Sequence, residues 1–176
     1  MARKLELITE FEVLEAHEAD KDMQALLTAA REAGAKAYAP YSHFLVGAAV
    51  MLTDGTIIIG SNQENAAYPS GICAERSAIF YTGSAHPGKE IKMIAVAAKP
   101  EHAPDYLTAS PCGACRQAML EYEDKQHKDI KLLLQGRGGQ VFISASVANL
   151  LPFKFDAAAL EGAGVMPETA EVKITA

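Results

Sequence analysis

Three cysteines, the only ones among the 176 residues, occupy two short segments of the chain. The first segment reads Cys73-Ala74-Glu75, and the second reads Pro111-Cys112-Gly113-Ala114-Cys115. Both segments are predicted to begin helices, so the fold must bring two helix N-termini to one point. Structural zinc sites usually have four protein ligands, whereas catalytic zinc sites have three and leave one position to water. Three thiols beside one glutamate therefore predict zinc-activated water with Glu75 as general acid and base, and so a hydrolytic enzyme.

Two alternatives for the cysteine pattern are less consistent with the residues. A structural zinc site needs a fourth ligand, and a thioredoxin-like redox site would have no third cysteine. The histidines offer no obvious fourth ligand, and each is expected in a loop or on the surface: His17, His43, His86, His102 and His127.

Three thiolates around one zinc ion carry excess negative charge, which a neighbouring cation could offset. Cys112 and Cys115 share one helix face, and the positive end of a helix dipole favours thiolates there. Three thiolates and one Zn²⁺ sum to a net charge of about −1, which would weaken the metal as a Lewis acid. Arg76 is predicted to donate hydrogen bonds to thiolate sulfur and offset that charge, and Arg116 is a second candidate.

Composition restricts the partners. Hydrophobic residues make up 49% of the chain and charged residues 22%, which is typical of one folded domain. The net charge of −6 disfavours nucleic acid and favours a small-molecule substrate. No apolar run has transmembrane length and no secretory signal is evident, so we expect a cytoplasmic protein with no membrane partner.

Residue patterns predict a single α/β domain. Asp54-Gly55 separates two β-branched runs and predicts a hairpin. Helices are expected over 22–36, 73–81, 111–123 and 147–151, and strands over 46–52, 56–60, 92–98, 130–135 and 140–144. This order predicts a three-layer α-β-α architecture with a mixed five-stranded sheet. Residues 1–21 are expected to form an acidic N-terminal arm or short helix, residues 22–155 the zinc-dependent domain, and residues 156–176 a C-terminal tail.

Five blocks of sequence resemble the small homotetrameric, three-cysteine zinc type of the cytidine/deoxycytidylate deaminase family. Cys-Ala-Glu followed by Pro-Cys-Gly-Ala-Cys matches the zinc-deaminase signature, with cysteine as the first ligand. The blocks follow the family order: 38–44 running into 46–49, 62–69, 73–76, 110–117, and 150–152 with Phe155.

The resemblance implies a role for particular residues. Cys73, Cys112 and Cys115 would ligate one zinc ion per chain, and Glu75 would shuttle protons. The implied substrate contacts are Asn62 and Glu64 to the ribose 3′-hydroxyl, Phe44 to the pyrimidine ring, and the backbone around Ala74 to the carbonyl edge of the base. Without the cysteine cluster, Asn62 and Glu64 would be interpreted as a polar loop and Phe44 as core.

The resemblance also implies an assembly and a reaction. Neighbouring subunits of a homotetramer would complete each pocket through Ala66, Tyr68 and Phe155. The implied reaction is deamination of cytidine and deoxycytidine to uridine and deoxyuridine plus ammonia, in pyrimidine salvage. Alternatives are deamination of another amine-bearing nucleoside such as blasticidin S, or a catalytically silent zinc-stabilised binding module. The chain departs from the family pattern in its longer tail beyond Phe155, and Ser61 stands where many relatives have a non-ligating cysteine.

Overall fold

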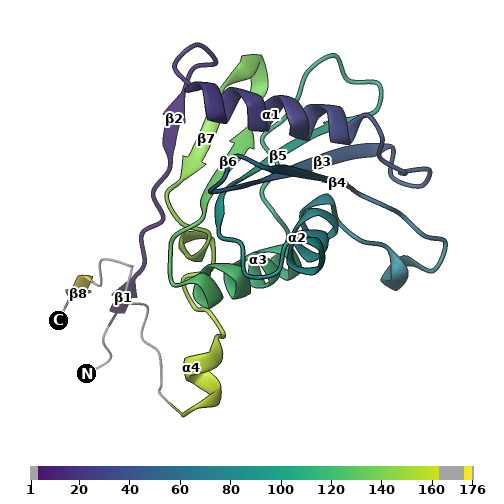
Figure 1. The fold of residues 1–176 in the computed structure, drawn as a ribbon. Helices are drawn as coiled ribbons and strands as arrows, with labels where there is room; N and C mark the ends of the chain where they lie inside the picture. Colours follow the sequence, from purple (N-terminus) through teal and green to yellow (C-terminus); the bar gives the residue numbers. More distant parts are fainter. Residues whose placement is uncertain (1–3, 163–172, 176) are drawn as a thin grey trace.

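The computed structural model describes residues 4–162 and 173–175, and it contains a mixed six-stranded sheet (Figure 1). The strands follow the order β2-β7-β6-β5-β3-β4 across the sheet. Their bounds are Glu12–Leu14 for β2, Phe44–Leu52 for β3, Ile57–Ser61 for β4, Ile91–Pro100 for β5, Lys131–Gln135 for β6 and Val141–Ser144 for β7. Strands β5 and β6 are parallel, and every other neighbouring pair in this sheet is antiparallel.

Three long helices cover the two faces of the sheet and give the predicted three layers (Figure 1). Helix α1 (Lys21–Gly34) lies across one face, and α2 (Ala74–Ala85) and α3 (Gly113–Gln126) lie across the other. The shorter elements are η1 (Tyr68–Ser70), η2 (Arg137–Gly139), η3 (Ala148–Leu150) and α4 (Ala157–Leu160). The predicted helix over 147–151 is thus only the short 3₁₀ turn η3.

Side chains that alternate along the strands belong to two hydrophobic clusters, one on each face of the sheet. Val50 and Ile94 are buried with Met119 of α3 on one side, whereas Ala49 and Leu133 pack with Leu26 of α1 on the other. Helix α1 approaches strand β3 closely because position 47 has no side chain. A Cβ atom on Gly47 would lie 1.9 Å from the backbone oxygen of Ala30 and 2.3 Å from the backbone nitrogen of Gly34. The missing side chain at Gly47 therefore permits the close approach of the two backbones.

The sheet has one strand more than predicted. Strand β2, in the acidic arm, pairs antiparallel with the edge strand β7, with Val13 opposite Phe142. The arm is also held by side chains, since Asn149 Nδ2 donates to the backbone oxygen of Glu10 at 2.8 Å. Strand β2 has only three residues, which is too short to show alternation, and exposed acids surround it. The prediction of an appendage or short helix there was wrong for this reason.

The two ends of the described chain lie side by side. Strand β1 (Lys4–Glu6) pairs antiparallel with β8 (Lys173–Thr175), so the N-terminal arm and the C-terminal tail meet in a separate two-stranded sheet (Figure 1). Neither strand was predicted, because three residues carry almost no periodic signal.

Helix α3 begins two residues later than predicted. Cys112 has extended backbone angles and is the N-cap residue, whereas the predicted start at residue 111 would place Ser110 in that role. The backbone oxygen of Pro111 accepts a 2.8 Å hydrogen bond from Arg116 Nε, which holds the preceding segment outside the helix. Cys73 is the corresponding N-cap of α2, so both helices begin directly after a cysteine.

Candidate active site

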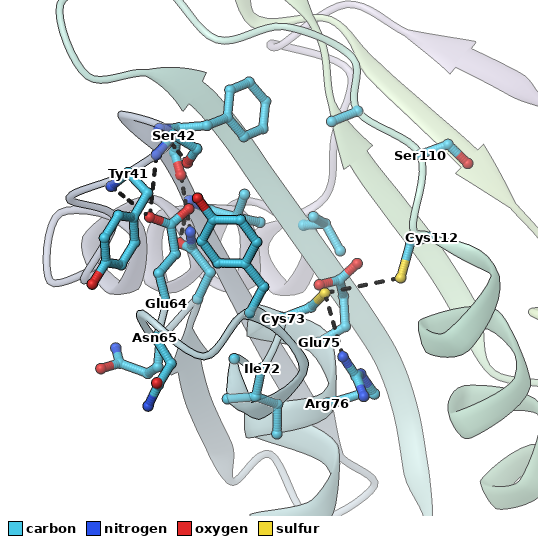
Figure 2. A pocket seen from close by; sticks show the side chains of 18 residues that line it. Tyr41, Ser42, Glu64, Asn65, Ile72, Cys73, Glu75, Arg76, Ser110 and Cys112 are labelled. Carbon is cyan, nitrogen blue, oxygen red and sulfur yellow. Dashed lines mark hydrogen bonds between the residues drawn. The ribbon is translucent and has the colours of Figure 1, made fainter.

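The three cysteine sulfurs meet where the N-termini of α2 and α3 converge. Figure 2 shows two of them, those of Cys73 and Cys112. Their Sγ atoms lie within 4.8 Å of one another, with 3.9 Å between Cys73 and Cys112 and 3.5 Å between Cys112 and Cys115. Cys115 is buried, Cys73 is half-buried and Cys112 is exposed towards the cavity described below. Among the residues that the structure describes, this is the one group of cysteine, histidine and acidic side chains that could hold a metal ion.

The thiols differ in acidity. A hydrogen bond from the Cys115 thiol, together with the nearby Arg76 guanidinium, lowers the pKa of Cys73 to about 5. The pKa of Cys115 is raised, because its thiol donates towards Cys73 and is buried. The cluster therefore already favours one thiolate without a cation. A bound divalent cation reverses the direction at Cys115, because a coordinating thiol is deprotonated. Three close sulfurs at two helix N-termini form a donor set that suits Zn²⁺.

Arg76 and Glu75 flank the cluster from the first turn of α2. Arg76 Nη2 donates to the Sγ atom of Cys73 at 3.7 Å, so the predicted contact with sulfur is present (Figure 2). Arg76 Nε is also buried and has no protein partner among the described residues. Glu75 is only 5% exposed, and burial raises the pKa of its carboxyl. A carboxyl with a raised pKa can both accept and release a proton closer to neutral pH.

A cavity of about 790 Å³ opens in front of the cysteines. Its lining includes Glu75, Arg76, Phe44, Asn62 and Glu64, which come from three separate segments of the sequence. Three of the predicted substrate-binding residues, Phe44, Asn62 and Glu64, therefore line the same cavity as Cys73 and Cys112.

Asn62 and Glu64 are held by backbone groups at the start of β3 and in the preceding loop. The Asn62 side chain accepts from the backbone nitrogen of Val46 and donates to the backbone oxygen of Phe44, both at 2.9 Å. Glu64 Oε2 accepts from the backbone nitrogens of Tyr41 at 2.9 Å and Ser42 at 3.2 Å. A hydrogen bond from the Ser42 side chain, together with these backbone bonds, lowers the pKa of Glu64.

Sequence reasoning missed the part that the 41–42 loop takes in this site. Tyr41 was not among the predicted site residues, but its backbone N–H fixes the Glu64 carboxylate (Figure 2). A backbone contact of this kind leaves no residue-type signal, because any residue except proline supplies the same N–H.

Of the three residues expected to complete the pocket of a neighbouring subunit, one lines the cavity of its own chain and two do not. Tyr68 lines the cavity of its own chain and makes an edge-on contact with Tyr41, with ring centroids 5.9 Å apart. Ala66 is exposed and is not part of the cavity lining. Phe155 is also outside that lining, and its side chain is 59% exposed. Ala74 is fully buried as the first residue of α2.

Arg116 does not contact sulfur among the bonds of the described residues. Its guanidinium instead donates to Pro111, Ser110 and Leu150. The prediction of Arg116 as a second thiolate donor was therefore wrong, because its guanidinium bonds two backbone oxygens and the Ser110 hydroxyl instead.

Comparison with known proteins decides the family. The family model described as the cytidine and deoxycytidylate deaminase zinc-binding region matches residues 20–128. The chain belongs to the cytidine and deoxycytidylate deaminase family. It is 40% identical over 136 residues to a cytidine deaminase of Halalkalibacterium halodurans, covering 77% of this chain and 96% of that relative. A cytidine deaminase of Sporosarcina psychrophila is 38% identical, and the match covers 76% of this chain and 91% of that relative.

Solved structures of the family have the same fold. The crystal structure of cytidine deaminase from Burkholderia pseudomallei matches with a TM-score of 0.64 and 41% identity, covering 74% of this chain and 97% of that one. The cytidine deaminase from Mycobacterium tuberculosis matches with a TM-score of 0.59 and 33% identity, covering 78% and 99%. Family membership and the three-thiol cluster together identify Zn²⁺ as the metal cofactor of this deaminase-family chain.

Proposed function

We propose that this chain is a hydrolytic deaminase that converts cytidine and deoxycytidine to uridine and deoxyuridine with release of ammonia. The observation that carries the proposal is one cavity with two ends of different chemistry. Glu75 lies at one end with Cys73 and Cys112, two members of the three-thiol cluster, and the fixed Asn62 and Glu64 side chains form the other. The named activities of similar proteins from Halalkalibacterium halodurans and Sporosarcina psychrophila support the same reaction.

The hydrogen bonds at the polar end fit a sugar hydroxyl. Asn62 Oδ1 and one of its N–H groups are engaged by strand β3, which leaves one N–H as a donor. Glu64 Oε2 is engaged by the 41–42 loop, which leaves Oε1 as an acceptor. A group bound between them must accept one hydrogen bond and donate another, as a 3′-hydroxyl does. A site of this kind strongly disfavours an analogue without the hydroxyl.

Charge supports a nucleoside rather than a nucleotide. Arg76 is the only basic residue among the described residues that line the cavity, and it already donates to Cys73. Glu64 and Glu75 are both acidic. A 5′-phosphate would therefore add negative charge to a cavity with no free cation to receive it, which disfavours binding.

The catalytic groups have separate tasks. Cys73, Cys112 and Cys115 are the residues that would hold the metal. Zinc, when bound, would lower the pKa of the attacking water and, as a Lewis acid, would stabilise negative charge on the oxygen that becomes bonded to C4. The Glu75 carboxylate takes the proton from the attacking water and delivers it to N3 of the base. The same carboxylate then takes the second proton from the oxygen now bonded to C4 and transfers it to the amino group. The C4–N bond breaks as the C4=O bond forms, so one water is consumed and one ammonia is released.

Two further contacts would orient the base. Phe44, half-buried in the cavity wall, can pack against the pyrimidine ring. No side chain caps the first turn of α2 in the described structure, and in this proposal a backbone N–H group around Ala74 binds the carbonyl oxygen of the base.

We also propose a homotetramer whose pockets are shared. Phe155 lies outside its own chain's cavity and is largely exposed, as are Phe80 and Tyr81 of α2. Large exposed aromatic side chains are typical of a surface that another chain covers. In this proposal residues 22–155 are the deaminase domain, residues 1–21 are an arm that lends it one strand, and residues 156–176 are a tail.

The proposed setting is pyrimidine salvage in the cytoplasm. Within the described ranges no helix is long and apolar enough to cross a membrane. The net charge of −6 supports a free nucleoside rather than a polynucleotide substrate.

A substrate panel tests the proposed function. Purified, zinc-loaded protein is assayed with cytidine, deoxycytidine, 3′-deoxycytidine, cytidine 5′-monophosphate and blasticidin S, and ammonia release is measured. We expect turnover of the first two, with a large loss of kcat/KM for the 3′-deoxy and 5′-phosphate compounds. Preferred turnover of blasticidin S, or none of any substrate with zinc bound, would overturn the proposal.

A further inference from the structure

Arg116, the residue directly after Cys115 on α3, bonds two segments that lie outside its own helix. Its Nε donates to the backbone oxygen of Pro111 at 2.8 Å, and its Nη2 donates to Ser110 Oγ at 2.9 Å. Its Nη1 donates to the backbone oxygen of Leu150 at 3.0 Å. The guanidinium thus binds the segment before Cys112 on one side and the end of η3 on the other.

The segment on the far side is itself fixed to α3. The buried carboxylate of Glu123 accepts from the backbone nitrogens of Val147 at 2.9 Å and Ala148 at 3.0 Å. It also accepts from the Ser146 hydroxyl at 2.6 Å. Leu150, at the end of η3, is therefore a firm anchor for Arg116 rather than a loose loop carbonyl.

The position of Cys112 depends on this anchor. Cys112 is the N-cap of α3, so its backbone lies outside the regular helix and is not held by helical hydrogen bonds on its N-terminal side. Ser110 and Pro111 lead directly into it, and Arg116 holds both. Charge-assisted hydrogen bonds from a planar guanidinium are directional, and lysine cannot reproduce three of them at once.

We propose that Arg116 is a positioning residue that keeps Cys112 in place for zinc by tying the 110–111 segment to the C-terminal end of η3. This role is separate from that of Arg76, which contacts sulfur directly. The inference rests on the zinc site of the proposed function, but it concerns metal retention and does not depend on which nucleoside is turned over.

The test measures zinc release rather than activity. Zinc-loaded wild type and Arg116→Lys are mixed with an excess of a chromogenic chelator, and the rate of zinc transfer is followed together with the melting temperature. We expect about ten-fold faster zinc release from Arg116→Lys, the lower end of the loss seen when partners of metal ligands are removed.

Arg31→Lys is the matched control. Arg31 also makes two side-chain hydrogen bonds, to Gln135 and Thr28, but it lies on α1 and does not line the cavity. It should lower the melting temperature to a similar extent and leave zinc release unchanged. Equal acceleration in both variants would mean that zinc release only reports general stability, which would overturn the proposal.

Two further variants keep the proposal falsifiable if Arg116→Lys folds poorly. Ser110→Ala removes one of the three acceptors and should accelerate zinc release by a smaller factor. Gln117→Met removes the 2.7 Å bond from Gln117 Nε2 to the Phe155 backbone oxygen and should leave zinc release at the wild-type rate. Wild-type release from a folded Arg116→Lys or from Ser110→Ala would contradict the role of Arg116. If the panel above shows no cytidine turnover but these rates differ as expected, only the proposed substrate fails.

Discussion

Arg76 Nη2 lies 3.7 Å from the Sγ atom of Cys73, and the two residues are one helical turn apart at the start of α2. A cation this close to a thiolate withdraws negative charge from the sulfur, and the contact raises the pKa of Arg76 while it helps to lower that of Cys73. The pair therefore offsets part of the excess charge that three thiolates bring to a divalent metal.

Removing the Arg76 charge should change the acid–base behaviour of the enzyme. In Arg76→Gln the sulfur would donate more charge to the metal, and the activated water would be less acidic. We expect the acidic limb of the kcat/KM profile for cytidine to move to higher pH. An unchanged profile in zinc-loaded protein would contradict this role for Arg76.

Glu64 offers a test of the sugar contact. In Glu64→Gln the amide can still accept from the 41–42 loop, but the group facing the cavity would then be a donor. We expect KM for cytidine to rise about 10-fold or more, which corresponds to the loss of one charged hydrogen bond. The measurement compares KM for cytidine and 3′-deoxycytidine in both proteins. A similar rise for both substrates would show that Glu64 acts on the fold rather than on the 3′-hydroxyl.

Gly47 tests the packing of α1 on β3. A Cβ atom there would lie 1.9 Å from the backbone oxygen of Ala30, and backbone cannot move aside as a side chain can. Gly47→Ala should therefore lower the free energy of unfolding by about 3 kcal/mol or more, as measured by denaturant titration. Gly113→Ala is the control, because nothing lies within 4 Å of a Cβ at that position. It should change stability by less than about 0.5 kcal/mol. Equal effects would contradict the close approach.

The lowered pKa of Asp54 predicts how the stability of the β3–β4 hairpin depends on pH. Hydrogen bonds from Thr56, with a contribution from Lys89, lower its pKa from 3.8 to about 2. Because the folded pKa is the lower one, the carboxylate stabilises the fold above about pH 4, and this contribution is lost as pH falls towards 2. Asp54→Asn should lower the melting temperature at pH 5 but not at pH 2. Asp129→Asn, at an exposed acid on another loop, is the comparison. If the melting temperatures of wild type and Asp54→Asn differed more at pH 2 than at pH 5, the predicted pH dependence would be contradicted.

The cysteine cluster and the three-layer arrangement of helices and sheet could be predicted from the sequence. Cys73 and the Cys112/Cys115 pair each follow a loop into an apolar helix pattern, and those patterns predicted α2 and α3. The strands β3 to β7 are long or apolar enough to be recognised, so a mixed sheet between helices was predicted correctly apart from its sixth strand.

The features that the sequence could not predict depend on backbone contacts or very short elements. Strand β2 is stabilised by pairing with β7 and not by its own pattern. The N-cap shift to Cys112 results from Arg116 holding Pro111, which is a tertiary contact. The support of Glu64 by Tyr41 uses backbone N–H groups that every such loop has. The position of Tyr68 in the cavity of its own chain depends on how η1 folds back onto Tyr41.

The central claim is zinc-dependent deamination with Glu75 as the proton carrier. The most direct measurement titrates zinc into metal-free wild type and Glu75→Gln while zinc binding and ammonia release from cytidine are followed together. The account predicts that both proteins bind one zinc per chain, that wild-type activity rises in proportion to zinc, and that Glu75→Gln loses a factor of about 10² to 10⁴ in kcat. Wild-type turnover without zinc, or near-wild-type turnover by zinc-loaded Glu75→Gln, would contradict it.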